Sequence, residues 1–226
     1  MTSARLVLNG PADDAVSVDK LVIAGWTARD RSALDKHIEE LRALGVAPPS
    51  SVPAFFPVEP ALLTTAREIA VAGPDTSGEV EFVLFSLPDG LWVGLGSDHT
   101  DRRMEAKSVA DSKRACAKPV APDLWRYSEI ADHWDALVLR SFAVEDRGRR
   151  PHQEGAAAAI LPPRDLIRRY RGGEGDLPLA TAMFCGTLPA LGPLVGMRGF
   201  EMELADPVLG RTIRHAYRVR GPEERG

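Results

Sequence analysis

The chain has 226 residues, of which 44% are hydrophobic, and its 28 basic and 32 acidic side chains give a formal net charge of -4. This length can bury a full core, and the mixed charges exclude a chain-wide basic footprint for nucleic acid or an anionic membrane. No stretch approaches the roughly 20 apolar residues that cross a bilayer, and the N-terminus lacks a long apolar signal core. We therefore expect one soluble, cytoplasmic domain over residues 1–226 that binds neither nucleic acid nor membrane.

The first 25 residues predict a pair of strands. Strand-like runs at 5–8 and 16–24 flank the turn signal Asn9-Gly10-Pro11. The period then changes to that of an amphipathic helix over 29–44, where apolar residues stand three and four apart at Leu34, Ile38, Leu41 and Leu44.

The centre of the chain predicts a β-hairpin. Apolar runs at 80–85 and 91–95 flank the turn Leu87-Pro88-Asp89-Gly90. Irregular, partly extended chain precedes the hairpin at 53–69, and a short helix is expected to start within 104–116.

The C-terminal half continues this pattern. After the stretch 137–144 we expect a connection containing Gly, Ala and Pro, and then a helix near 164–170. Three strands follow at 182–185, 200–204 and 212–219, and the tail 221–226 should fray. Many short strands with few helices favour an α+β domain, rich in β structure, whose mixed sheets wrap into a roll or open barrel with peripheral helices.

Three carboxylates frame the predicted hairpin. Glu79 and Glu81 stand two apart, so strand alternation points them the same way. A register centred on Pro88 and Asp89 brings Asp98 level with both. Acids so close repel one another unless they are protonated or neutralised, and an all-oxygen set suits Mg²⁺, Mn²⁺ or Ca²⁺. From these residues alone, a divalent metal site and an ordinary solvated strand face both stay open.

Two further groups can be interpreted in more than one way. His37 and Glu40 lie one helical turn apart and could hold a water as base and orienting carboxylate, or could simply flank the core. Arg102 and Lys113 could receive a carboxylate ligand, or could form local salt bridges with acidic neighbours.

A glycine-punctuated loop follows the strand predicted at 182–185. In it, the backbone at Gly186 and the hydroxyl of Thr187 could approach a ligand oxygen. An ordinary turn is the alternative interpretation.

The order of these features resembles the fumarylacetoacetate hydrolase superfamily over about residues 25–219. The matching motifs follow one another along the chain: a His-x-x-Glu helix, a proline-bearing stretch near Phe55 and Phe56, a Glu-x-Glu, an Asp-x-Thr-x-Arg, a lysine, a Gln-Glu-Gly and a Gly-Thr loop. The segments Gly-Ser-Asp-His-Thr-Asp and Phe-Cys-Gly-Thr are similar to those of an uncharacterised bacterial family of unknown function in or near this group.

The resemblance implies a role for each matched residue. Glu79, Glu81 and Asp98 would bind Mg²⁺ or Mn²⁺, with Ca²⁺ as a further option. A substrate carboxylate and oxo group would be held by Arg102, Lys113, Thr187, Gly186 and Gln153. Catalysis would fall to Lys113 and to the water-activating pair His37 and Glu40, on a lid helix at 29–44.

The resemblance also implies a fumarylacetoacetase C-terminal-domain fold, a homodimer, and hydrolysis of a carbon–carbon bond in a small 2-oxo acid, as in acylpyruvate hydrolysis. Decarboxylation or tautomerisation of an oxaloacetate-like acid is an alternative, and so is non-catalytic dicarboxylate binding. The chain departs from the family pattern at Arg103, where an aspartate is usual, and at Glu105, where a glutamine is frequent.

Overall fold

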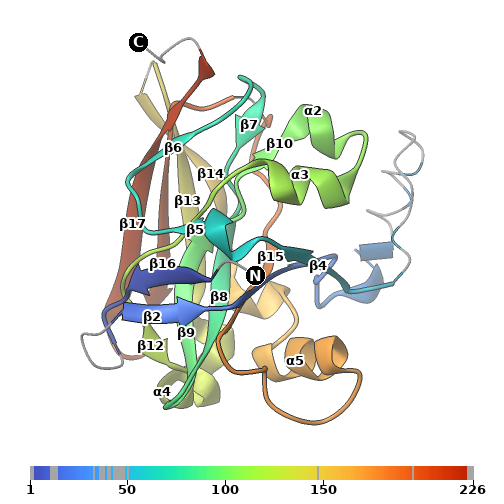
Figure 1. Ribbon diagram of the computed structural model, residues 1–226, viewed down its shortest axis with the longest axis vertical. Helices are drawn as coiled ribbons and strands as arrows, with labels where there is room; N and C mark the ends of the chain where they lie inside the picture. Colours follow the sequence, from blue (N-terminus) through green and yellow to red (C-terminus); the bar gives the residue numbers. More distant parts are fainter. Residues whose placement is uncertain are drawn as a thin grey trace.

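Two main β-sheets dominate the computed structural model (Figure 1), which describes residues 3–10, 15–32, 34–35, 39, 42, 49, 51–146, 148–194 and 196–222. The six-stranded sheet has the order β12-β9-β8-β15-β3-β4. Its strands are β12 (Trp125–Arg126), β9 (Gly90–Ser97), β8 (Val80–Leu87), β15 (Thr181–Thr187), β3 (Lys20–Gly25) and β4 (Ala54–Val58).

The five-stranded sheet has the order β14-β13-β16-β17-β6. Its strands are β14 (Gly148–Ala156), β13 (Val138–Glu145), β16 (Gly199–Asp206), β17 (Arg211–Arg220) and β6 (Glu68–Ala70). Each main sheet contains one parallel pair, β15 with β3 and β17 with β6, among antiparallel neighbours. The predicted class, a β-rich α+β fold of mixed sheets, is therefore confirmed.

Short strand pairs and helices surround the sheets. The pairs are β1 (Ala4–Val7) with β2 (Ala15–Val18), β7 (Thr76–Ser77) with β10 (Thr100–Asp101), and β5 (Leu63–Thr64) with β11 (Lys118–Pro119). The α-helices that lie wholly within the described residues are α2 (Arg102–Glu105), α3 (Val109–Ala115), α4 (Tyr127–Ile130) and α5 (Pro163–Arg171), and the 3-10 turns there are η1 (Pro60–Leu62), η2 (Ala131–Ala136) and η3 (Ala157–Ala159). Figure 1 places α2 and α3 together beside β7 and β10, whereas α4 and α5 lie at the other end of the sheets. Among the described residues, no helix is long and apolar enough to cross a membrane.

Strand β8 is buried on both faces, which explains its nearly unbroken apolar sequence. Phe82 packs with Val80 and Leu84, two positions away on either side, in the core cluster that also contains Phe200 of the five-stranded sheet. Phe85 points the other way, into a second cluster with Leu21 of β3 and Leu6 of β1. Burying one such side chain fully contributes about 1.5–3 kcal/mol. The hairpin at the centre of the fold is thus held rigidly from two sides.

The β8–β9 hairpin has the predicted register. Leu87 pairs with Gly90 and Val80 pairs with Ser97, so the turn is centred on Pro88 and Asp89. The same register continues outward to the acidic residues that flank the hairpin.

Strand β14 lies where the sequence predicts a connection after residue 144. That prediction is wrong, since residues 148–156 form a strand. Its Gly and Pro content indicated a loop, yet it pairs along the whole of β13. The register shifts between Ser141 and Phe142, so that Phe142 faces Pro151 and Ser141 faces Gln153. This bulge accommodates the proline, which has no N–H for the ladder. It also leaves His152 and Gln153 both buried.

The predicted lid helix at 29–44 is described only at scattered positions. His37 and Glu40 both lie outside the described residues, as do residues 223–226 of the predicted frayed tail. The roles predicted for His37 and Glu40 stay predictions.

Candidate metal centre

Glu79, Glu81 and Asp98 converge at the open end of the β8–β9 hairpin. Each offers a carboxylate oxygen, and these three atoms lie within 4.8 Å of one another. The hairpin ladder brings them together, because the Asp98 N–H donates to the Glu79 carbonyl at 3.0 Å, one step beyond the last strand pair. Glu81 is 1% exposed and Asp98 is 0% exposed. A solvated strand face does not describe these two acids.

Glu81 is held by the loop that follows β15. The Gly186 N–H donates to Glu81 Oε2 at 2.7 Å. Gly186 has a φ of 94°, and a Cβ at this position would lie 1.8 Å from Thr27 Oγ1. Only glycine lets the backbone approach the carboxylate in this way. Burial, reinforced by the negative charge of Asp98, raises the pKa of Glu81 well above its usual value.

Two lysines contact Asp98 from different elements. Lys113 comes from α3, whose N-terminus Ser108 caps. Its Nζ lies 2.5 Å from Asp98 Oδ2 and 3.4 Å from Glu79 Oε2. Lys118 comes from β11, and its Nζ lies 2.7 Å from Asp98 Oδ1 while donating to the His99 carbonyl at 2.9 Å. Both ammonium groups are buried.

Sequence reasoning missed Lys118. It stands in the mostly apolar segment Ala117-Lys118-Pro119-Val120-Ala121. A lysine is rarely fully buried unless it is paired, so an isolated lysine in apolar chain was the available signal.

Arg102 provides the third cation. Its Nη1 donates to Glu79 Oε1 at 2.8 Å and to Glu105 Oε2 at 2.7 Å, and its Nε donates to Ser77 Oγ at 2.6 Å. The other terminal nitrogen, Nη2, is buried and has no hydrogen-bond partner among the described residues. Arg102 therefore forms the local salt bridge with Glu105 and still keeps a free donor.

The three cations set the ionisation of two acids. Burial alone would raise the pKa of Asp98, but Lys113 and Lys118 outweigh it and lower that pKa to about 2. Burial likewise opposes ionisation of Glu79, and the charges of Lys113 and Arg102 lower its pKa overall. The donor set, three convergent carboxylates of which at least two are ionised, fits a hard divalent cation.

His99 faces away from the acids, into the core. Its Nδ1 lies 2.9 Å from the Tyr217 hydroxyl, which is 2.8 Å from Ser97 Oγ. Burial is the largest cause that lowers the pKa of His99, to about 3, so its imidazole is neutral.

Gln153 and Thr187 bind the peptide groups between the two glutamates. Gln153 Oε1 accepts from the Val80 N–H at 2.9 Å, and its Nε2 donates to Thr187 Oγ1 at 2.7 Å and to the Leu188 carbonyl at 2.6 Å. The Thr187 hydroxyl in turn donates to the Val80 carbonyl at 2.7 Å. Both backbone groups of Val80 are thereby fixed, and this residue separates Glu79 from Glu81.

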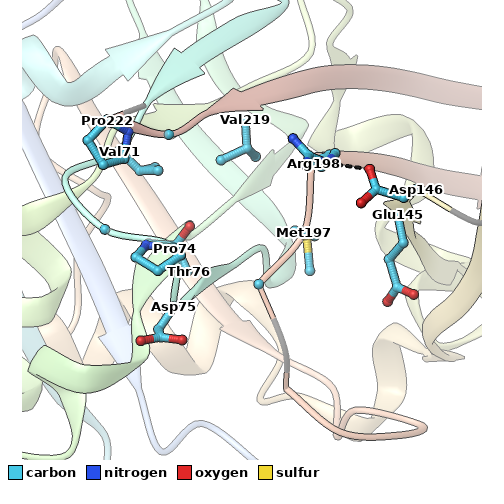
Figure 2. A pocket seen from close by; sticks show the side chains of 13 residues that line it. Val71, Pro74, Asp75, Thr76, Glu145, Asp146, Met197, Arg198, Val219 and Pro222 are labelled. Atoms are coloured by element: carbon cyan, nitrogen blue, oxygen red, sulfur yellow. Dashed lines mark ion pairs between the residues drawn. The ribbon is translucent and has the colours of Figure 1, made fainter. Parts of the chain in front are cut away.

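A separate cavity of about 670 Å³ lies at the rim of the five-stranded sheet (Figure 2). None of the three clustered acids lines it. Figure 2 shows the Arg198–Asp146 ion pair on one wall, with Asp75 on the opposite side. The cavity lining meets the acidic site where the Asp75 carbonyl accepts from the Arg102 N–H at 2.9 Å, and where Met197 Sδ accepts from the N–H of Gly78, next to Glu79, at 3.5 Å. The chemistry of the acids therefore does not belong to this cavity.

The chain is similar in fold to several solved structures. A candidate fumarylacetoacetate isomerase/hydrolase from Oleispira antarctica is 17% identical, with a TM-score of 0.66 over 96% of this chain and 100% of that one. A fumarylpyruvate hydrolase from Pseudomonas aeruginosa, described in complex with Mn²⁺ and pyruvate, is 18% identical, with a TM-score of 0.64 over 97% and 96%. A yeast protein of the fumarylacetoacetate hydrolase family is 12% identical, with a TM-score of 0.62 over 90% and 93%.

These likenesses establish the fold, as the sequence motifs predicted. No curated protein matches the chain. A family model described as "Protein of unknown function (DUF2848)" matches residues 24–217. The chain therefore belongs to that family of unknown function, and its fold is that of the fumarylacetoacetate hydrolase family.

Proposed function

We propose that the protein is a metal-dependent hydrolase that cleaves a carbon–carbon bond in a small 2-oxo carboxylic acid of the acylpyruvate type. The observation that carries the proposal is the convergence of Glu79, Glu81 and Asp98 within 4.8 Å, beside the partly buried Arg102, whose buried Nη2 has no hydrogen-bond partner among the described residues. The Mn²⁺ and pyruvate described in the Pseudomonas aeruginosa hydrolase of the same fold support this choice of metal and substrate class.

Each residue has a distinct role in this proposal. Glu79, Glu81 and Asp98 would hold Mg²⁺ or Mn²⁺, and Ca²⁺ also suits their oxygens. Bound there, the ion supplies Lewis acidity to a 2-oxo oxygen and to the negative charge that develops on it. Arg102 Nη2 and the Lys113 ammonium orient the substrate carboxylate.

Lys118 is the fixed counter-charge of Asp98, because it is anchored to a backbone carbonyl. Gly186, Thr187 and Gln153, to which the resemblance assigns substrate binding, would in addition hold the strand that carries the glutamates, through their bonds to Glu81 and Val80. His37 and Glu40 would activate the attacking water.

A second candidate is decarboxylation or tautomerisation of an oxaloacetate-like 2-oxo acid. Among the described residues, the side chains that pair with the three acids are Arg102, Lys113 and Lys118, all of them cations. Cations and a metal ion suffice to stabilise enolate charge, whereas hydrolysis also needs an activated water. This observation favours a reaction without water if His37 and Glu40 do not reach the site.

Product analysis separates these candidates. The protein is incubated with Mn²⁺ and either acetylpyruvate or oxaloacetate, and the loss of enol absorbance is followed. Acetate plus pyruvate identifies the hydrolase, and CO₂ plus pyruvate identifies the decarboxylase. Glu81→Gln should abolish either activity, whereas Glu68→Gln, on the exposed part of edge strand β6, should not.

Two outcomes would contradict an enzyme. Unchanged substrates with ligand-induced thermal stabilisation would indicate a non-catalytic binder of small dicarboxylates. No stabilisation by Mn²⁺, Mg²⁺ or either acid would overturn the metal site as well. The predicted homodimer is tested separately by light scattering of the purified protein.

A further inference from the structure

We infer that Lys113 and a divalent metal ion compete for the same carboxylate oxygens, so that metal binding moves the Lys113 ammonium off Glu79 and Asp98. Lys113 is then a tethered cation that neutralises the site until a metal ion takes its place. This inference rests on the proposed function, because it assumes that the acids bind a metal.

The geometry of Lys113 is that of a bridging cation. Its Nζ lies 2.5 Å from Asp98 Oδ2 and 3.4 Å from Glu79 Oε2, so it stands between two of the three proposed ligands. Both hydrogen bonds that it makes with described residues go to these carboxylates. A divalent ion would approach the same oxygens to about 2.0–2.6 Å. The two cations therefore draw on the same lone pairs at close range.

Lys118 differs from Lys113 in its anchoring. Lys118 is 0% exposed and is tied to the His99 carbonyl as well as to Asp98 Oδ1. Moving it would leave a buried carbonyl without its donor, which is costly. Lys113 has no such backbone bond among the described residues. Asp98 can thus keep Lys118 on one oxygen and exchange the partner of the other.

Charge balance also favours displacement of one lysine. Four acids, Glu79, Glu81, Asp98 and Glu105, face three cations, Arg102, Lys113 and Lys118, so two added positive charges would leave this cluster with an excess of positive charge. Repulsion between cations a few ångströms apart is strong in such surroundings. Lys113 can relieve it by side-chain rotation alone, since its four-carbon stem is flexible. The released ammonium would be available to the substrate carboxylate.

Calorimetric titration with Mn²⁺ tests the competition. The Lys113→Met variant, prepared free of metal by chelation, should bind Mn²⁺ roughly tenfold more tightly than the unaltered protein. The matched control is Arg114→Met, which removes the same charge from the next, exposed position of α3. It should change the dissociation constant by less than about twofold, because a solvated charge is well screened. Equal or weaker binding by Lys113→Met overturns the inference.

Thermal unfolding provides the second readout. Without metal, Lys113→Met should melt at a lower temperature than the unaltered protein, because the buried Asp98 and the partly buried Glu79 lose a counter-charge. Saturating Mn²⁺ should close this gap. A gap of the same size with and without Mn²⁺ would mean that Lys113 only stabilises the fold, and it would overturn the inference.

A labelling experiment on the unaltered protein covers the case in which the variant does not fold. Acetylation of lysines by an N-hydroxysuccinimide ester is measured by mass spectrometry, with the exposed Lys107 as internal reference. Mn²⁺ should raise the labelling of Lys113 relative to Lys107, and no rise would overturn the inference. If Mn²⁺ binds without affecting Lys113, only this inference fails. If neither protein binds Mn²⁺, the proposed function fails with it.

Discussion

Asp98 and Glu79 face each other across the open end of the β8–β9 hairpin, with the Asp98 N–H bonded to the Glu79 carbonyl at 3.0 Å. The backbone bond fixes the separation of the two Cα atoms before any ligand binds. Glu81 joins them because alternate residues of β8 point to one face. The metal centre that we propose is therefore preorganised by strand register, and its weak points are the groups that hold that register or balance its charge.

Asp98→Asn should remove metal binding and destabilise the protein. The amide cannot neutralise Lys113 and Lys118, which stay buried beside it. Breaking a buried ion pair from one side costs about 3–5 kcal/mol. Urea unfolding should show a loss of this size, and titration with Mn²⁺ should show no binding. The control is Asp89→Asn in the turn at the opposite end of the hairpin, where the exposed pair with Arg126 is worth at most about 1 kcal/mol. A metal affinity unchanged by Asp98→Asn would contradict its assignment as a ligand.

Gln153→Ala should weaken Mn²⁺ binding although we assign Gln153 no contact with the metal. The substitution leaves the buried Val80 N–H and the Leu188 carbonyl without their partners. Each unsatisfied group costs about 1–3 kcal/mol. The peptide between the two glutamates would then be free to shift.

Paired measurements of unfolding free energy and Mn²⁺ affinity check this prediction. Glu154→Ala is the matched control, since the neighbouring side chain is largely exposed and pairs with Arg140. It should leave Mn²⁺ affinity unchanged. If Gln153→Ala lost stability but bound Mn²⁺ normally, Gln153 would support the sheet without positioning the acids.

The sequence predicted the hairpin acids because their placement depends on local rules. A turn signal fixes the register, and the register fixes which residues face each other, so Asp98 could be matched to Glu79 by counting from Pro88 and Asp89. The fold class followed in the same way from strand length and spacing. Assignment of the metal chemistry required the resemblance, because an acidic pair on a strand does not by itself distinguish a ligand set from a surface.

Contacts between distant segments could not be predicted in this way. Strand β14 contains Pro151 and two glycines, and only its partner β13 and the bulge opposite Ser141 make it a strand. The bonds of Gln153 to Val80 and Leu188 depend on that pairing. Lys118 was missed for a similar reason, since no local pattern links a lone lysine to a carboxylate twenty positions earlier in the chain, at Asp98.

Gly186→Ala should be among the most damaging small substitutions in the chain. A Cβ would lie 1.8 Å from Thr27 Oγ1, and the backbone has a φ of 94°. Positive φ and overpacking together should cost about 3 kcal/mol. Metal binding should weaken as well, because the Gly186 N–H holds Glu81.

Chemical denaturation of Gly210→Ala separates the cost of the positive φ from the cost of the clash with Thr27. Gly210 also has a positive φ, of 65°, but nothing lies within 4 Å of a Cβ there. Its substitution should cost only about 1–2 kcal/mol, the backbone part alone. Adding Thr27→Ala to Gly186→Ala should recover part of the lost stability. Equal costs for the two glycine variants would mean that the clash with Thr27 is relieved without cost.

Asp206 should contribute stability that is lost in acid. Its Oδ1 accepts from the Val208 and Leu209 N–H groups, each at 3.1 Å, at the turn between β16 and β17. Burial opposes its ionisation, but these N–H groups and His133 outweigh burial and lower the pKa of Asp206. A folded pKa below the unfolded value of about 3.9 stabilises the folded state above that pH. The contribution must vanish as the pH falls through the folded pKa.

The loss of unfolding free energy caused by Asp206→Asn, measured in urea at several pH values, should therefore become smaller as the pH falls. Near pH 7 the variant should be less stable than the unaltered protein, by about 1–3 kcal/mol for a carboxylate that accepts several partly buried hydrogen bonds. The difference in unfolding free energy between the two proteins should narrow below about pH 4, where the unaltered protein begins to lose this contribution. Asp132→Asn, at the exposed position just before His133, should show no such difference at either pH. A gap for Asp206→Asn that stays constant or widens in acid would show that the charge of Asp206 does not stabilise the turn.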